Sequence, residues 1–121
     1  MLAPTMRKAS RPTPPPSLDP EAMREHASDA AQLLRTLAND KRLMLLCLLV
    51  AGERSVSELN AKVELSQSAL SQHLAVLRAD GLVSTRREAQ TIYYRLADGP
   101  AQRILGILHD IYCGNAQACP A

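Results

Sequence analysis

Apolar residues recur at helical spacing over most of the chain beyond residue 20, and turn signals divide the pattern into short segments. The pattern predicts helices near residues 20–37, 40–51, 57–63, 66–80 and 101–113. Two shorter runs, near residues 82–88 and 91–96, alternate like strands, with Ala89 and Gln90 at the turn between them. The sequence therefore predicts a mainly helical fold of five helices and a two-stranded β-hairpin.

Residues with strong capping preferences support several of these boundaries. Asn39 stands in front of the second helix, and Gly52 follows it. Ser57 and Ser66 are the expected N-caps of the third and fourth helices, and Gly81 ends the fourth. The order helix, turn, helix and hairpin is that of a winged helix-turn-helix, which is a DNA-binding fold.

The fourth predicted helix has the side chains that a recognition helix needs. Such a helix presents short polar residues near its N-terminus, where it enters the major groove. Here these residues are Ser66, Gln67, Ser68, Ser71 and Gln72. Glutamine can bond adenine in two places, and serine can bond a base edge or a phosphate. An ordinary amphipathic helix with a solvated polar face is the alternative interpretation.

The predicted hairpin favours the DNA-binding interpretation. Arg86 and Arg87 precede its turn, and Arg95 lies on the return strand. A wing that contacts backbone phosphate needs cations at this place. We therefore expect the serines and glutamines to read bases and the wing arginines to bind phosphate. His73, between the polar and apolar faces of the helix, is expected to hydrogen-bond a neighbouring helix.

Charge and composition indicate one folded domain with a tail at each end. The net charge is +2, and residues 1–20 account for all of it. Six of the eight prolines also lie there, so residues 1–19 are expected to form a disordered basic tail. Residues 20–114 are expected to form the DNA-binding and dimerisation domain, with a flexible tail over residues 115–121.

Two motifs in the predicted domain resemble a known family. The segment Leu37-Ala38-Asn39-Asp40-Lys41-Arg42-Leu43 and the later pattern S-x-x-S-Q-H-L…L-x-x-x-G-L-V, over residues 68–83, are similar to the ArsR/SmtB family of bacterial repressors. The resemblance covers residues 30–113. It implies a homodimer that binds an inverted-repeat operator and releases it when an inducer arrives.

The metal-sensing members of that family differ from this chain in their ligand residues. Arsenic and cadmium sensors carry E-L-C-V-C-D-L before the recognition helix, whereas residues 54–59 here contain no cysteine. Zinc and nickel sensors have further ligand pairs on the last helix, where this chain offers only His109, Asp110 and Cys113. A tetrahedral zinc site needs about four such ligands, so no metal site is assigned.

Two cysteines suggest a different inducer. The contexts of Cys47, within the second helix, and Cys113, at the end of the last, resemble the BigR/SqrR branch of the family. That resemblance implies a dithiol sensor in which persulfide or polysulfide links the two cysteines and derepresses sulfide-detoxification genes. Cys119 lies in the expected tail and is expected to be dispensable. A metal sensor with ligands from Cys47, Cys113, His109 or Cys119 is the alternative.

Apolar stripes on the first and last helices predict a homodimer, because so small a monomer would not cover both. No nucleophile–base pair or phosphate-binding glycine loop is present, so an enzyme is not expected, nor is a cofactor. No apolar run reaches about 18 residues, so we expect no membrane span, a cytoplasmic location and reduced cysteines. A protein-interaction module built on the same fold remains a further alternative.

Overall fold

The computed structural model describes residues 18–114, which divide into two compact units at Gln32 and Leu33. Nearly all of the expected N-terminal tail lies outside the described residues. The expected C-terminal tail, which includes Cys119, lies wholly outside them.

The first unit contains α2 (Pro20–Arg24) and the beginning of α3 (Ala27–Leu37). The expectation of one continuous helix over residues 20–37 is therefore wrong. The backbone N–H of His26 donates to the carbonyl of Met23, three residues back, at 2.9 Å, so the α-helical ladder is interrupted there. The regular pattern resumes when Ala30 bonds the carbonyl of His26.

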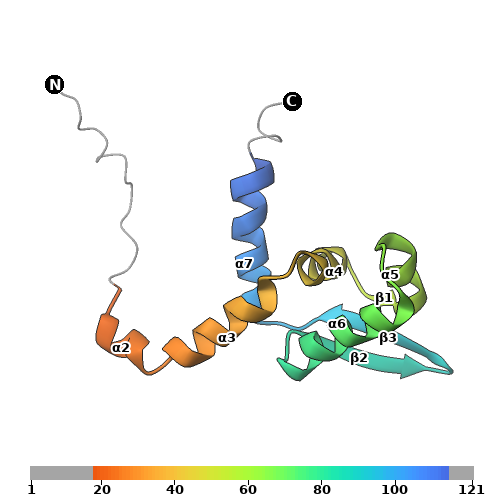
Figure 1. Ribbon diagram of the computed structural model, residues 1–121, viewed down its shortest axis with the longest axis horizontal. Coiled ribbons are helices and arrows are strands. Elements are labelled where there is room, and N and C mark those ends of the chain that lie inside the picture. The colour runs from red at the N-terminus through yellow and green to blue at the C-terminus, as the bar shows by residue number, and fades with distance from the viewer. Residues whose placement is uncertain (1–17, 115–121) are drawn as a thin grey trace. The chain divides into compact units, whose positions relative to one another are not determined.

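The second unit holds the remaining elements (Figure 1). They are α4 (Asp40–Val50), β1 (Arg54–Ser55), α5 (Val56–Lys62), α6 (Gln67–Ala79), β2 (Val83–Glu88), β3 (Thr91–Leu96), α7 (Pro100–His109) and a π-helical turn (Asp110–Gly114). The winged helix-turn-helix prediction is confirmed, but the described residues form six α-helices and three strands, not five and two.

The antiparallel sheet has the strand order β1-β3-β2. Tyr93 of β3 is opposite Ser55 of β1 on one side and Arg86 of β2 on the other. The predicted two-residue turn fixes this hairpin register, which pairs Glu88 with Thr91. Strand β1 was missed because two residues are too short to show an alternating pattern.

Leucine side chains from every long helix of the second unit form the core. Burying each of them stabilises the fold by about 1.5–3 kcal/mol. The buried residues are Leu37, Leu45, Leu46, Leu49, Leu59, Leu70, Leu74, Leu77, Leu82, Val83, Ala101 and Leu105. Helix α4 packs against α6, β3 and α7, so it is central, as its apolar sequence predicts. Only one stripe of α4 is buried, however, and Met44, Cys47 and Val50 are exposed.

Local hydrogen bonds explain most helix ends. The side chain of Asn39 accepts from the backbone of Lys41 and Arg42, so the predicted cap of α4 is confirmed. The expected cap Ser57 is wrong: Ser55 caps α5 and forms a reciprocal capping box with Glu58. Glu58 also lies three residues after Ser55, so the sequence contained this signal.

Helix α6 ends in a Schellman motif. Leu82 N donates to Leu77 O, and Gly81 N donates to Arg78 O. Gly81 has a φ of 74°, which favours glycine, and Leu82 is buried beneath the turn. This geometry turns the chain directly from α6 into β2.

Three hydrogen bonds connect the end of α3 with α4 and α6. Arg42 of α4 donates through Nε to the carbonyl of Thr36 at 2.7 Å, and its Nη1 is 3.5 Å from His73 Nδ1 on α6. Because arginine only donates, His73 Nδ1 accepts. Thr36 Oγ1 also donates to Asp80 at the end of α6. The expectation that His73 bonds a neighbouring helix is thus confirmed.

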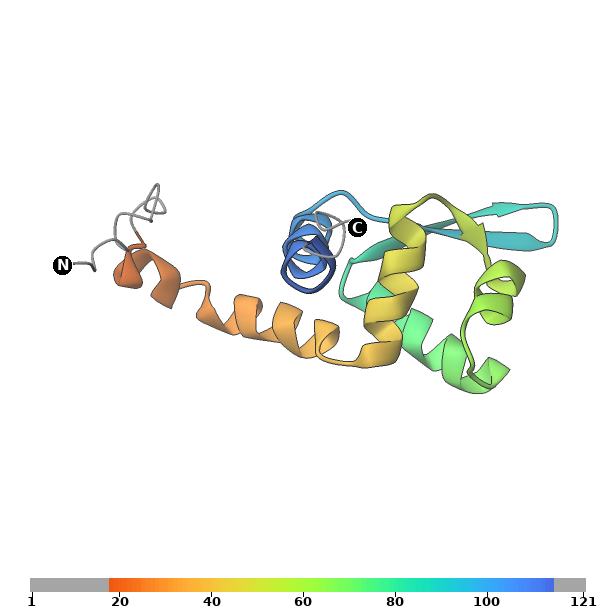
Figure 2. The ribbon, with the colours of Figure 1, turned by 90° about the horizontal axis from the view of Figure 1, so that it is seen from above.

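Figures 1 and 2 show how these elements are arranged within the second unit. The β2–β3 hairpin extends beyond α5 and α6 on one side, as a wing. Helix α7 lies beside α4 and rises away from the sheet in Figure 1. The recognition-helix candidate and the last helix therefore occupy different sides of the central α4.

Candidate nucleic-acid interface and thiol site

Helix α6 presents its polar residues to solvent and its leucines to the core. Leu70 and Leu77 are fully buried, and Leu74 is 2% exposed. The candidate base-reading side chains, Ser66, Gln67, Ser68, Ser71 and Gln72, are all exposed. Helix α5 precedes α6 through a short turn, and together they form the helix-turn-helix.

The hydroxyl of Ser66 has a structural task in addition to any DNA contact. Its Oγ accepts from the backbone N–H of Ala69 at 3.1 Å and is 3.4 Å from Ser68 Oγ. A serine that caps a helix through its lone pairs can still donate its O–H to a phosphate. Ser66 is therefore suited to contact the DNA backbone, whereas Gln67 and Ser71 are suited to contact base edges.

The two adjacent wing arginines differ in their surroundings. Arg86 is bonded to Glu53 through two 2.8 Å contacts and to Glu88 at 2.9 Å, and it lies 4.5 Å above the ring of Tyr93. Arg87 is exposed and forms no ion pair with any residue in the range 18–114. Of the two expected phosphate contacts, Arg87 has the free charge and Arg86 anchors the wing.

The sheet register explains this difference. Successive residues of β2 point to opposite faces of the sheet, so Arg86 and Arg87 cannot share one. Arg87 lies on the face that carries Tyr94, and Tyr94 lines a groove of about 480 Å³ together with residues of α6. Arg87 is thus directed to the same side of the sheet as α6.

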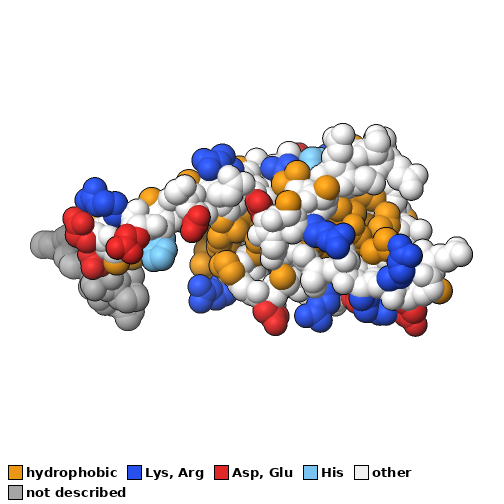
Figure 3. Space-filling view, turned by 90° about the horizontal axis from the view of Figure 1, so that it is seen from below, with side chains coloured by type: hydrophobic (Ala, Val, Ile, Leu, Met, Phe, Trp, Pro, Cys, Tyr) orange, Lys and Arg blue, Asp and Glu red, His pale blue; other side chains and the backbone are white. Residues whose placement is uncertain are grey.

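One cation of this groove was missed in the sequence analysis. Arg78 is exposed on the last turn of α6 and lines the groove with Ser71 and Tyr94. In Figure 3, Lys and Arg side chains are spread over the face shown and do not join into one basic patch. This agrees with a folded domain whose net charge is close to zero. Phosphate binding therefore depends on where individual Lys and Arg side chains lie.

The two candidate sensor cysteines lie on α4 and in the turn that follows α7, the helix that packs against α4. Cys47 is on α4 and Cys113 is in the π-helical turn that follows α7; both are exposed free thiols. Partial burial raises the pKa of the Cys47 thiol, and the charge of Cys113 raises it further. Burial and the Cys113 charge thus act in the same direction on the Cys47 thiol, and burial has the larger effect.

A groove of about 420 Å³ lies between α4 and α7 beside Cys47. Its lining consists of Cys47, Val50, Gln102, Leu105, Gly106, His109 and Asp110. His109 is also four residues before Cys113. The groove gives small molecules access to the Cys47 thiol, and it was not expected from the sequence.

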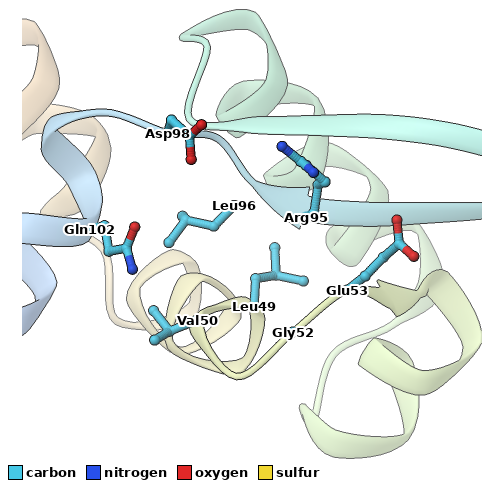
Figure 4. A pocket seen from close by; sticks show the side chains of 8 residues that line it. All are labelled: Leu49, Val50, Gly52, Glu53, Arg95, Leu96, Asp98 and Gln102. Carbon is cyan, nitrogen blue, oxygen red and sulfur yellow. The ribbon is translucent and has the colours of Figure 1, made fainter.

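A second cavity, of about 370 Å³, lies next to this groove and shares Val50 and Gln102 with it. Figure 4 shows the aliphatic side chains of Leu49, Val50 and Leu96 between the polar side chains around them. Glu53 and Arg95 complete its wing side. The surface beside Cys47 thus continues to the base of the wing.

Within residues 18–114, no three His, Cys, Asp or Glu side chains lie together as a candidate metal site. In the same range, every helix is too short or too polar to span a bilayer.

Comparison with known proteins identifies the family. A sequence model of the bacterial regulatory protein, arsR family, matches residues 39–85. The transcriptional activator HlyU of Vibrio cholerae is 50% identical over 93 residues, which are 77% of this chain and 86% of that protein. The chain belongs to the arsR family of bacterial regulatory proteins.

Further relatives show which branch of the arsR family this chain resembles. The biofilm growth-associated repressor of Xylella fastidiosa strain 9a5c is 44% identical over 100 residues, 83% of this chain and 88% of that protein. The crystal structure of the repressor BigR from Xylella fastidiosa matches with a TM-score of 0.74 at 44% identity, covering 79% of this chain and 98% of that one. The predicted family and its BigR-like branch are thus confirmed.

These relatives also define the general activity. HlyU is named as a transcriptional activator and the Xylella protein as a repressor, neither as an enzyme, and the solved structures of HlyU and BigR share the fold of this chain. The chain is accordingly a DNA-binding transcriptional regulator of the arsR family.

Proposed function

We propose that this arsR-family regulator is a homodimeric repressor whose operator affinity is switched off when sulfane sulfur links Cys47 to Cys113. The observation that carries the proposal is the groove that Cys47 lines together with His109 and Asp110, because Cys113 follows Asp110 by three residues in the same turn and both thiols are exposed. In the proposed mechanism, α6 reads bases, the wing binds phosphate, and the linked thiols change the arrangement of the two subunits.

Exposed apolar side chains on and after α7 support the dimer. Ile107 is 59% exposed, Ile111 58% and Tyr112 78%. Large apolar residues so exposed near one another usually mark an interface. A two-fold interface through this helix would give two recognition helices, which suits an inverted-repeat operator.

The linking reaction balances with a hydropersulfide, R–S–SH, as the only oxidant. One cysteine thiolate attacks the outer sulfur of R–S–SH and releases RS⁻, which leaves the cysteine as its persulfide. A second R–S–SH extends that persulfide by one sulfur and again releases RS⁻. The other cysteine thiolate then attacks the middle sulfur and expels HS⁻. For one bridging sulfur, two thiols and two R–S–SH give a trisulfide, two RSH and H₂S.

The position of Cys47 supports coupling between this link and DNA. Helix α4, which carries Cys47, packs against α6 and β3, and the segment after α4 holds Glu53, the partner of Arg86 in the wing. A link that moves α4 or α7 would therefore reach both DNA-contacting elements. A coupling free energy of about 1–3 kcal/mol, or five- to 150-fold in affinity, is enough for release.

The proposal is tested by operator binding and intact-mass analysis of the same samples. Wild-type protein, Cys47→Ala and Cys113→Ala are each treated with glutathione persulfide and titrated against a fluorescent fragment of their own promoter. We expect the wild type alone to gain bridging sulfur and to lose affinity. Release by both single-cysteine variants, or a linked wild type that still binds fully, would contradict the proposal.

A parallel zinc titration addresses the metal-sensing alternative. Zinc at nanomolar free concentration is expected to leave operator affinity unchanged. Tight zinc binding with operator release would replace the sulfur proposal by the metal one.

A further inference from the structure

The groove between α4 and α7 has the size and composition of a small-molecule site. Its volume of about 420 Å³ lies within the usual range of about 300–1,000 Å³ for ligand pockets. Aliphatic side chains of Val50 and Leu105 form part of its wall, and Cys47 lies on the α4 side. Gln102, His109 and Asp110 supply a few polar groups on the α7 side.

The α7 wall of this groove has room for a side chain at Gly106. Gly106 of α7 lines it, and a Cβ atom built there would meet no other atom within 4 Å. Glycine inside a helix is unfavourable by about 1 kcal/mol relative to alanine. Neither packing nor a positive φ requires glycine at this position, so a larger side chain can be introduced into the groove here.

The groove would stay accessible in the proposed dimer. On a helix with about 100° between residues, Gln102, Gly106 and His109 share one face. Ile107, an exposed residue of the proposed interface, projects from a different face of α7. Dimerisation through Ile107 therefore leaves the Gln102, Gly106 and His109 side of the groove free for a ligand, and Asp110, three residues after Ile107, lies at the border with the interface.

We propose that this groove binds the organic part of an amino-acid persulfide and directs its outer sulfur to Cys47. The inference rests on the proposed dithiol function and adds the class of sulfur donor. An amino-acid persulfide carries an ammonium, a carboxylate and a short aliphatic stem. Asp110 can accept from the ammonium, the Gln102 amide can donate to the carboxylate, and Val50 and Leu105 can contact the stem.

The bound donor then reacts in one displacement. The Cys47 thiol loses its proton, and its sulfur attacks the outer sulfur of R–S–SH. The S–S bond of the donor breaks, and RS⁻ leaves and takes up a proton. The Cys47 sulfur is oxidised, and the inner sulfur of the donor is reduced. Cys47 then carries a persulfide, which is the species that leads to the link with Cys113.

The test compares an organic with an inorganic sulfur donor in the full-length protein. Gly106→Leu fills the groove at a position where the structure leaves room for the side chain, and Gly106→Ala is the matched control of smaller volume. The rate of persulfide formation on Cys47 is measured by mass spectrometry with cysteine persulfide, with glutathione persulfide and with inorganic hydrogen disulfide. Circular dichroism and operator affinity of the reduced variants report folding.

Gly106→Leu is expected to lower the ratio of the cysteine-persulfide rate to the hydrogen-disulfide rate by about tenfold or more, because pocket contacts of this size discriminate by about 10- to 200-fold. Gly106→Ala should lower the same ratio less. A ratio that stays at the wild-type value, whether both rates fall or neither does, overturns the inference. A ratio that falls only for glutathione persulfide assigns the groove to the peptide donor and overturns the amino-acid one.

A second measurement needs no variant. S-methylcysteine has the same organic group but no transferable sulfur, so it should slow the alkylation of Cys47 by iodoacetamide in the wild-type protein. Equal alkylation with and without it would overturn the inference. Failure of the dithiol function itself is distinguishable, because hydrogen disulfide would then modify the wild type without releasing its operator.

Discussion

Arg86 of the wing donates from Nε and Nη2 to the two carboxylate oxygens of Glu53, at 2.8 Å each. The Arg86 hydrogen bonds lower the pKa of Glu53, and this effect is larger than the opposing effect of burial. Glu53 lies between α4 and β1, so this contact joins the wing to the end of the helix that carries Cys47. It gives Arg86 and its neighbour Arg87 different roles.

Replacing the two arginines separately should show these roles. Arg87→Ala is expected to weaken binding to all DNA sequences alike and to reduce the salt slope of log K by about one for each phosphate that the variant no longer neutralises. Its thermal stability should equal that of the wild type. Arg86→Ala is expected to lower the thermal midpoint, because it removes the interactions with Glu53, Glu88 and Tyr93.

Fluorescence anisotropy over a series of salt concentrations and thermal unfolding check both expectations. Glu53→Gln is the matched control, because it weakens the anchor and keeps the Arg86 charge. If Arg86→Ala changed the salt slope without any effect on unfolding, its assignment as an anchor would be wrong.

Base readout by α6 predicts a sequence-dependent loss. Gln67→Ala and Ser71→Ala are each expected to weaken operator binding and also to reduce the preference for the operator over mutated sites, by about 1–3 kcal/mol for a bidentate contact. Binding of each variant to a panel of single-base operator mutants measures this. Val76→Thr, an exposed change of similar volume on the same helix that lies outside the groove lined by Ser71, is the control. A uniform loss over the whole panel would assign these side chains to the backbone instead.

The raised pKa of Cys47 predicts how its reactivity depends on pH. Because the thiolate is the nucleophile, a raised pKa leaves less thiolate at neutral pH, and the alkylation rate should continue to rise above the ordinary cysteine range. Cys113→Ser removes the nearby charge and should move the midpoint to lower pH, while burial still holds it above the usual value. Site-resolved mass spectrometry of iodoacetamide labelling measures both curves; coincident curves would mean that the two thiols do not interact.

The proposed dimer interface predicts a loss of both association and DNA binding. Ile107→Glu places a charge on an exposed apolar face and is expected to give a monomer in light scattering at micromolar protein. Operator affinity should fall strongly, because each subunit then binds its half-site alone. Gln102→Glu, an exposed change on a different face of the same helix, is the control. A dimeric Ile107→Glu protein would place the interface elsewhere.

The wing turn predicts a simple gain in stability. Ala89, the first residue of the two-residue turn, has a φ of 58°, a conformation that favours glycine. Ala89→Gly is therefore expected to raise the free energy of unfolding by about 0.5–1 kcal/mol, as measured by urea denaturation. Gln90→Gly should not stabilise, because Gln90 has no positive φ. Equal effects of the two changes would contradict this reading of the turn.

The parts of the fold that local interactions set were predictable. Asn39 and Ser66 cap helices where the sequence indicates, and the hairpin register follows from a two-residue turn. Strand β1 was not predictable, because it depends on pairing with β3. The helix break at His26 was not predictable either, because it depends on a single shifted hydrogen bond. The π-helical turn at Asp110–Gly114 also differs from the regular helix expected there, and the spacing of apolar residues contains no sign of it.

The candidate site shows the same division. The exposure of Ser71 and Gln72 follows from the leucines on the other side of α6, which local periodicity reveals. The contrast between Arg86 and Arg87 does not follow from local periodicity. It depends on Glu53, which is 33 residues away from Arg86 in the chain. Arg78 and Gly106 become candidate functional residues only because they line grooves that form in the folded chain.

The sequence by itself determined the helix-turn-helix, the hairpin and the family, because periodicity, caps and turns act between residues a few positions apart. Only the tertiary structure decided which wing arginine keeps a free charge, and where a groove opens between Cys47 and the end of α7. Those properties arise when α4, β3 and α7 pack together, and electrostatic and steric contacts between distant segments leave no periodic trace in the chain.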